Sequence, residues 1–394
     1  WYQWTKNGNF ACVPMDTEAL TSEGWKTYDQ LKEDDLVLGY DGGELKWTPV
    51  RKKFKFSDAP LVEMKNNHFK SVSTPDHRWV GNKRVGGKNT RRYEDRMFTT
   101  DQVCKESTIY LSAPVRDESL LSITDEEAAL IGFAYSDGNI DRSKKGNGPS
   151  RGRNRKKVGF RVKLLQSKPE GVEYVENLLK KWGGNYRHQT RPRVEEHHGE
   201  IQVWTLNPTQ AREIWKRAGL WDREDFQTFI LRLGTSQRKA FLEAVDMAEG
   251  FWDRRGNTRT IAQNKGSFAD AIELCAFMCG YFPTTHERKK GDYPTEETAT
   301  TIRLSKPFVT GQRLVKTNLP GLHEVWCVKT DLDSWVMRQG GQIMLTGNCQ
   351  YGAQESSGTA DRAYHLKGAQ AIVQSSFGNI KRLNHTIIDH ANKY

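Results

Sequence analysis

The adjacent residues Asn348 and Cys349 combine two groups that can break a peptide bond. An asparagine side-chain amide can attack its own carbonyl carbon, close a succinimide ring and release the residue that follows. A cysteine thiolate is a strong nucleophile near neutral pH and can accept an acyl group first. The dipeptide alone is ordinary in loops, but a second cysteine, Cys12, and the element Thr74-x-x-His77 stand near the opposite end of the chain. Together these residues predict self-cleavage at both ends of segment 12–348.

Short strands with glycine turns are expected on both sides of a long central region. Residues 17–56 alternate and contain the turn Asp41-Gly42-Gly43, which is typical of a compact all-β structure. Pro75 favours extended backbone before it, so we expect Thr74 and His77 at a turn and not on a helix. Near the C-terminus, strands are expected at 312–315 and 324–330.

These motifs in combination resemble the splicing motifs of inteins, which share the Hint fold with hedgehog autoprocessing domains. The resemblance covers residues 12–348 and leaves 1–11 and 349–394 as flanks from a host protein. It implies that His77 hydrogen-bonds the nitrogen of the Ala11–Cys12 peptide and later protonates it, with Thr74 as an auxiliary donor. Distorting an amide and protonating its leaving nitrogen both lower the barrier to attack. No cofactor is implied for splicing.

Three further residues resemble the signature of class 3 inteins: Trp79, Cys327 and Thr346. In that class an internal cysteine attacks the upstream junction directly, and the first residue is not the nucleophile. Cys12 departs from this pattern, so both cysteines remain candidates for the first nucleophile, with Cys327 preferred. Gly347 stands where inteins usually carry a histidine, so cyclisation of the asparagine needs another activator.

A different pattern begins near residue 122 and occurs twice. Helical stretches with small residues end in an acid followed by glycine, at Asp137 and at Glu249. After each come strands, a Gln-x-Lys triplet that ends at Lys168 or Lys265, and a further helix. This order indicates an internal duplication of roughly 100 residues.

The repeat resembles the LAGLIDADG homing endonucleases that are inserted in many inteins. The resemblance implies that the two motif helices pack together and that Asp137 and Glu249 meet at a pseudo-twofold axis, where they bind Mg²⁺. Lys168 and Lys265 would stabilise charge that develops on the phosphate. Glu249 replaces the usual Asp, so retained cutting is an open question. The competing hypothesis is a DNA-binding endonuclease whose splicing function has decayed.

The net charge of +11 and pI near 9.2 predict a polyanionic partner, here double-stranded DNA at a homing site. Basic residues gather at 142–157, 187–193 and 254–259, and the first run precedes a strand-like stretch suited to a DNA groove. The sequence has no run of 18 apolar residues, which predicts no membrane span. Six cysteines without disulfide-framework spacing predict a reducing, cytoplasmic location. We expect a monomer.

The flanks, once joined, would place Lys6, Phe10 and Tyr351 in a pattern that resembles the nucleotide-binding O-helix of family A DNA polymerases. The expected fold class is α+β and multidomain: an all-β, horseshoe-like Hint domain interrupted by an α/β LAGLIDADG pseudo-dimer. The expected parts are a flank (1–11), the first splicing part (12–120), the endonuclease (121–300), the second splicing part (301–348) and a flank (349–394).

Overall fold

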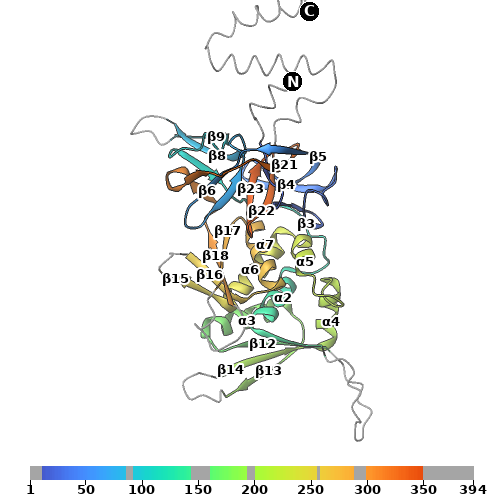
Figure 1. Ribbon diagram of the computed structural model, residues 1–394. Coiled ribbons are helices and arrows are strands. Elements are labelled where there is room, and N and C mark those ends of the chain that lie inside the picture. The colour runs from blue at the N-terminus through green and yellow to red at the C-terminus, as the bar shows by residue number, and fades with distance from the viewer. Residues whose placement is uncertain are drawn as a thin grey trace, which may run out of the picture.

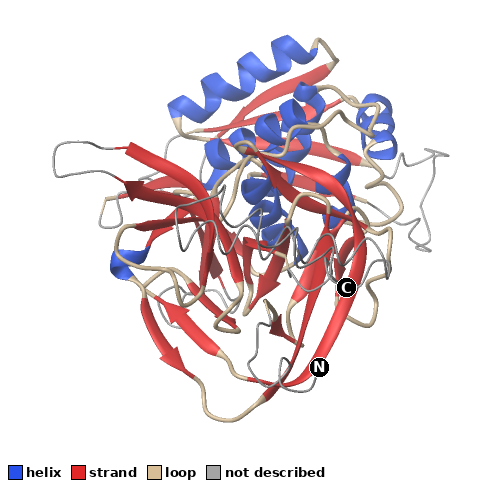
Figure 2. Ribbon diagram, turned by 90° about the horizontal axis from the view of Figure 1, so that it is seen from above, coloured by secondary structure: helices blue, strands red, loops and turns tan. Residues whose placement is uncertain are grey.

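The computed structural model describes residues 11–85, 92–142, 160–192, 200–254, 258–287 and 299–348. Most of both flanks, including Cys349 and the polymerase-like residues, and most of the basic run 142–157 lie outside this range. Strands from the two ends of the described chain share one part of the molecule, and the helices lie between them and further strands (Figure 1). Seen from above, the helices gather in one region and the strands curve around the rest (Figure 2).

The largest sheet of the described residues has eight strands and mixes the two ends of the chain in the order β1-β21-β5-β4-β2-β22-β23, with β3 paired to β2. The long strand β5 pairs with β4 along its first half and with β21 along its second, so the sheet curls. Its members are β1 (Val13–Pro14), β2 (Glu18–Thr21), β3 (Gly24–Lys26), β4 (Leu36–Asp41), β5 (Glu44–Ala59), β21 (His323–Thr330), β22 (Ser334–Gln339) and β23 (Gln342–Gly347).

Two smaller sheets complete the strand-rich part within the described ranges. One has the order β19-β10-β8-β9, and the other has the order β20-β6-β7. Their strands are β6 (Val62–Lys65), β7 (Lys70–Ser73), β8 (Arg78–Val85), β9 (Arg92–Thr99), β10 (Ser107–Tyr110), β19 (Phe308–Thr310) and β20 (Val315–Asn318).

Of two local predictions for the strand-rich part, one is confirmed and one is wrong. The turn at Thr74–His77 is confirmed, because these residues link β7 to β8 and the His77 amide donates to the Thr74 carbonyl at 3.0 Å. The strand expected at 312–315 is wrong: a 3₁₀ turn, Gly311–Arg313, covers its first two residues and β20 begins at Val315. The turn is closed by the Leu314 amide, which donates to the Gly311 carbonyl at 3.1 Å.

The central region contains two four-stranded sheets with the same arrangement. The first has the order β11-β12-β14-β13, and the second has the order β15-β16-β18-β17. The strands are β11 (Gly138–Asp141), β12 (Arg161–Gln166), β13 (Tyr186–Arg191), β14 (Ile201–Leu206), β15 (Gly250–Asp253), β16 (Thr258–Asn264), β17 (Phe282–Glu287) and β18 (Ala299–Ser305). The duplication inferred from the sequence is therefore present as two copies of one topology. β18 continues five residues past the expected boundary at 300.

Six helices of the described residues accompany these sheets: α2 (Asp125–Ser136), α3 (Pro169–Trp182), α4 (Pro208–Arg217), α5 (Phe226–Arg232), α6 (Thr235–Glu249) and α7 (Ser267–Met278). Helix α2 begins with a capping box between Thr124 and Glu127, which satisfies amides that no helical carbonyl reaches. Helices α2 and α6 pack closely because Gly132 faces the Phe241 carbonyl, where an added Cβ would be only 2.8 Å away.

The central region is hydrogen-bonded to the strand-rich part. The end of α7 meets the linker after β10, where the Val115 amide donates to the Met278 carbonyl at 2.9 Å. Phe282 of β17 enters the same apolar cluster as Phe69 and Trp79. Within the part of the chain that the structure describes, no helix is both long and apolar enough to span a bilayer.

Candidate active sites

The Ala11–Cys12 peptide bond, called the upstream junction here, lies just before β1 of the large sheet. Ala11 and Cys12 are buried, and the Cys12 amide nitrogen donates to Thr74 Oγ1 at 3.0 Å. The Thr74 amide donates in turn to the Cys12 carbonyl at 3.0 Å. This nitrogen is the leaving group of the Ala11–Cys12 bond, so Thr74 contacts the atom that must be protonated when the bond breaks.

The downstream junction meets the same turn from the other side. Thr346, on β23, hydrogen-bonds His77 through its Oγ1 and the imidazole Nε2. Both residues are fully buried. The resemblance implied Thr74 as an auxiliary donor near the scissile nitrogen, and Thr74 does bond this nitrogen. His77 Nε2 bonds Thr346, which it can reach because β23 runs beside the start of β8.

Thr100, which the sequence did not single out, holds the backbone of His77 and the side chain of Trp79. Trp79 lies edge-on to His77, with ring centroids 5.1 Å apart. Its indole nitrogen donates to Thr100 Oγ1 at 3.0 Å, and the Thr100 amide donates to the His77 carbonyl at 2.8 Å. Thr100 follows β9, 23 positions from His77, so only the pairing of β8 with β9 could have revealed it.

The two candidate nucleophiles occupy one apolar cluster with Ala11. Strand β1 pairs with β21 so that Val13 faces Trp326 and Pro14 faces Val325. Cys12 directly precedes Val13, and Cys327 directly follows Trp326. Both cysteines are buried to within 1%. Both cysteines therefore pack in the cluster that contains Ala11.

Asn348 is completely buried at the end of β23. Its amide nitrogen donates to the Asp333 carbonyl at 3.0 Å, and its side-chain Nδ2 donates to the Thr330 carbonyl at 3.2 Å. Its Oδ1 has no hydrogen-bond partner among the described residues. An amide that donates through nitrogen without accepting through oxygen keeps more electron density on the nitrogen, which favours attack by Nδ2.

The close contact of Gly347 with the Arg78 backbone explains why a histidine does not precede Asn348. An added Cβ at this position would lie 2.7 Å from the Arg78 carbonyl oxygen and 2.9 Å from its carbonyl carbon. Contacts this short with backbone cannot be relieved by turning a side chain. The approach of β23 to β8, which brings Thr346 to His77, thus requires glycine here.

A second candidate site lies where α2 and α6 end. Asp137 caps α2, Glu249 is the last residue of α6, and the two carboxyl groups interact. Gln166 Nε2 donates to Asp137 Oδ2 at 2.9 Å. Burial raises the pKa of Glu249 to about 7, with repulsion from Asp137 adding to it, and burial also raises the pKa of Asp137.

The two lysines of the repeat differ in their surroundings. Lys168 lies beside Gln166, whose Oε1 accepts from the Lys168 amide at 2.9 Å. The positive charge of Lys168 offsets part of the rise that burial causes in the pKa of both carboxyl groups. Lys265 instead forms an ion pair with Glu287. The structure therefore brings together Asp137, Glu249 and Lys168, but directs Lys265 elsewhere.

The pair Asp137 and Glu249 fits a divalent cation. Two half-buried carboxyl groups that resist ionising together form a hard-oxygen donor set, and a bound dication would relieve their repulsion. Groups of three or more His, Cys, Asp and Glu side chains suited to a metal are absent from the described residues. A pair of carboxylates is a donor set that Mg²⁺ commonly takes, with water or phosphate oxygens as its other ligands.

A basic surface extends along one face of the first repeated sheet. The strand register puts Arg161 and Lys163 of β12 on the same face as Arg187 and Arg191 of β13. The opposite face carries buried residues that pack on the helices. On this face Arg161, Arg187 and Arg191 are exposed and Lys163 is half-buried. In the second sheet, Arg303 on the corresponding face is paired with Asp253, within 3.2 Å.

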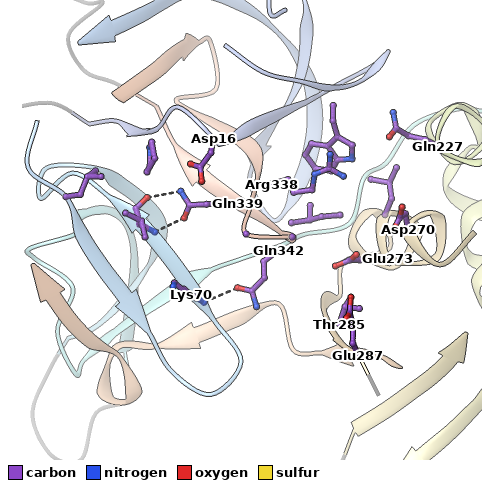
Figure 3. A pocket seen from close by; sticks show the side chains of 18 of the residues that line it. Asp16, Lys70, Gln227, Asp270, Glu273, Thr285, Glu287, Arg338, Gln339 and Gln342 are labelled. Atoms are coloured by element: carbon purple, nitrogen blue, oxygen red, sulfur yellow. Dashed lines mark hydrogen bonds between the residues drawn. The ribbon is translucent and has the colours of Figure 1, made fainter. Parts of the chain in front are cut away.

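A cavity of about 900 Å³ lies between the strand-rich part and α7. Figure 3 shows Glu273 and Asp270 on its helical side and Arg338 and Gln339 on its strand side. Gln339 Nε2 donates to the Val72 carbonyl at 2.9 Å and anchors β7, which leads directly into Thr74. Burial raises the pKa of Glu273 to about 7. The predicted residues do not line this cavity.

No protein-family model matches the chain. Among curated proteins, it is 22% identical to a ribonucleoside-diphosphate reductase subunit beta of Aquifex aeolicus over 380 residues, 87% of this chain and 51% of that protein. It is 21% identical to an ATP-dependent Clp protease proteolytic subunit of Chlamydomonas moewusii over 294 residues, 68% of this chain and 28% of that protein. The chain thus spans about half or less of the length of these relatives.

Solved structures similar to the chain are of two kinds. The homing endonuclease I-DmoI, in complex with DNA and Mn, covers 46% of this chain and 89% of its own, at 14% identity and TM-score 0.30. The AceL NrdHF class 3 split intein covers 86% of this chain and 99% of its own, at 9% identity and TM-score 0.30. The N-terminal LAGLIDADG domain of DUF199/WhiA covers 47% and 77%, at 12% identity and TM-score 0.29.

Proposed function

We propose that residues 12–348 form a self-splicing protein segment that excises itself and joins its flanks. The carrying observation is that both ends of this segment meet one buried turn. Thr74 binds the nitrogen of Cys12, and His77, three residues later, binds Thr346 next to the downstream junction. Holding reactive groups in one site replaces encounters between free molecules and accounts for a large part of such rate enhancements.

The reaction begins when a thiol attacks the carbonyl carbon of Ala11. The new bond is a thioester, the Ala11–Cys12 peptide bond breaks, and the nitrogen of Cys12 gains a proton with help from the Thr74–His77 turn. Cys327 is the preferred nucleophile, and Cys12 is the alternative. The thiol of Cys349 then takes the acyl group from the first sulfur.

Asn348 completes the excision. Its Nδ2 bonds to its own carbonyl carbon, the bond to Cys349 breaks, and one Nδ2 proton ends on the new amino group of Cys349. That amine then attacks the neighbouring thioester, so the thiol is released and an Ala11–Cys349 amide remains. No metal or organic cofactor takes part in these steps.

The two cysteine variants test the route. The full chain carrying Cys327→Ala and the full chain carrying Cys12→Ala are incubated side by side, and their products are weighed by mass spectrometry. Loss of splicing in Cys327→Ala alone supports attack by the internal thiol. Splicing that survives Cys327→Ala but not Cys12→Ala assigns the attack to Cys12.

We also propose that the central region is an endonuclease for double-stranded DNA. Two observations favour it: a carboxyl pair at the ends of paired helices, and a basic open face on the adjoining sheet. Asp137 and Glu249 would hold Mg²⁺, which activates water and stabilises the leaving oxygen when bound. Lys168 balances negative charge beside the pair.

A further inference from the structure

Two tryptophans of the large sheet each hold one end of segment 12–348. The indole nitrogen of Trp326 donates to the Pro14 carbonyl at 3.0 Å, two residues after Cys12. The indole nitrogen of Trp335 donates to the Gly347 carbonyl at 3.2 Å, one residue before Asn348. Both side chains are completely buried, and their ring centroids are 5.1 Å apart. The two rings are therefore chemically alike and adjacent, but contact opposite junctions.

The hydrogen bond from Trp335 acts on the peptide that leads into Asn348. The carbonyl of this peptide belongs to Gly347 and accepts from Trp335, while its N–H belongs to Asn348 and donates to Asp333 at 3.0 Å. Partners on both edges fix the peptide plane. The Thr330 carbonyl fixes the side-chain Nδ2 from a third direction.

This arrangement restricts the motions that would carry Nδ2 away from its target. Ring closure needs Nδ2 to reach the carbonyl carbon of the same residue, and freely rotating asparagine side chains spend little time in that geometry. With the preceding plane and the amide nitrogen both held, rotation inside Asn348 is the main freedom left. Ordering a nucleophile in this way raises its effective concentration.

We propose that Trp335 is a positioning residue for the cyclisation of Asn348, acting through the Gly347 carbonyl. The inference rests on the proposed splicing function and adds the component that Gly347 cannot supply, since this position has no room for a side chain. In the step it assists, the Nδ2–carbon bond forms, the bond to Cys349 breaks, and the displaced proton ends on the Cys349 amine.

Trp335→Phe in the full chain tests this role, because it keeps an aromatic ring and removes only the indole donor. Trp326→Phe is the matched control: it makes the same change in a neighbouring buried ring whose donor serves the upstream strand. Two rates are measured for each chain by intact mass. One is the breakage of the Asn348–Cys349 bond, called downstream release here, whether residues 349–394 leave free or joined to residues 1–11. The other is the cleavage after Ala11 induced by dithiothreitol, which reports the upstream thioester.

The expected result is a split between the two rates. Trp335→Phe slows downstream release by about tenfold, the scale of one lost hydrogen bond, and leaves thiol-induced upstream cleavage within about twofold. Trp326→Phe keeps the downstream rate and slows upstream cleavage instead, on the same scale. Equal losses of both rates in Trp335→Phe, or an unchanged downstream rate, would overturn the positioning role. A wild-type chain that releases neither flank would overturn the proposed splicing function itself.

Discussion

Thr346 and His77 share a hydrogen bond between Oγ1 and the imidazole Nε2, although 269 positions separate them in the chain. Thr346 lies two residues before Asn348, and His77 lies on the turn that holds the Cys12 nitrogen through Thr74. The turn from Thr74 to His77 thus contacts residues next to both peptide bonds that the proposed splicing would exchange. The predictions below follow from this connection and from the carboxyl groups of the central region.

Thr346→Val should weaken this connection without a large change in volume. Valine cannot bond the imidazole, so His77 loses the partner that orients its ring, and we expect upstream cleavage to slow about tenfold. The measurement is dithiothreitol-induced cleavage after Ala11. Thr48→Val, a buried threonine of β5 away from the junctions, is the control and should keep the wild-type rate. Equal rates of upstream cleavage in Thr346→Val and Thr48→Val would show that Thr346 does not orient His77 for this step.

Restoring the usual penultimate histidine should harm this protein. Gly347→His places a Cβ within 2.9 Å of three atoms of Arg78, which separates β23 from β8. We expect a lower thermal midpoint and loss of downstream release, because Thr346 and Asn348 move with the strand. Gly347→Ala should show the same defect in milder form. Faster downstream release in Gly347→His would contradict this prediction, because it would show that β23 can move away from β8 without slowing cleavage.

The carboxyl pair should control DNA cutting but not splicing. A plasmid carrying the uninterrupted host sequence that encodes residues 1–11 joined to 349–394 is the substrate, incubated with Mg²⁺ or with EDTA. Asp137→Asn and Glu249→Gln should each slow cleavage by about 100-fold or more, while gel-shift binding persists. EDTA should stop cutting and leave the splicing rate unchanged. Cutting by either variant at the wild-type rate would exclude the pair as metal ligands.

Glu273 should make stability depend on pH. Burial raises its pKa from 4.5 to about 7, so the folded state retains a proton that the unfolded chain has lost between these values. Stability therefore falls as pH rises from 4.5 to about 7, by roughly 3 kcal/mol for this group alone. Glu273→Gln should match wild type near pH 4 and have the higher thermal midpoint at pH 8.

Glu213→Gln is the control for Glu273→Gln, because Glu213 lies exposed on the surface of α4. Its thermal midpoint should match that of wild type both near pH 4 and at pH 8. A midpoint difference between Glu273→Gln and wild type that is constant from pH 4 to pH 8 would contradict a buried titration at this position.

The sequence predicted most of the elements that carry the site, for physical reasons that can be traced. The helical stretches that end in an acid followed by glycine located α2 and α6, and the repeated order of elements predicted two similar sheets. Pro75 correctly indicated a turn at Thr74. These features depend on residues close in sequence, which is where propensity and patterning act.

Contacts between distant segments were beyond such reasoning. Trp335 and Thr330 hold Gly347 and Asn348, and Thr100 holds Trp79, through hydrogen bonds that depend on strand pairing. The pairing of Lys265 with Glu287 likewise arises from the second sheet. Gly347 was recognised as a departure, but its cause, the Arg78 backbone, appears only once β23 lies against β8.

The intact mass of the wild-type chain after incubation tests the central claim most directly. The chain is purified at its full mass of 45.1 kDa and sampled over time in reducing buffer at neutral pH. The account predicts two products: an excised fragment of residues 12–348 ending in a succinimide, and a shorter chain in which Ala11 is joined to Cys349. Material that stays at full mass, with neither product after long incubation, would contradict it.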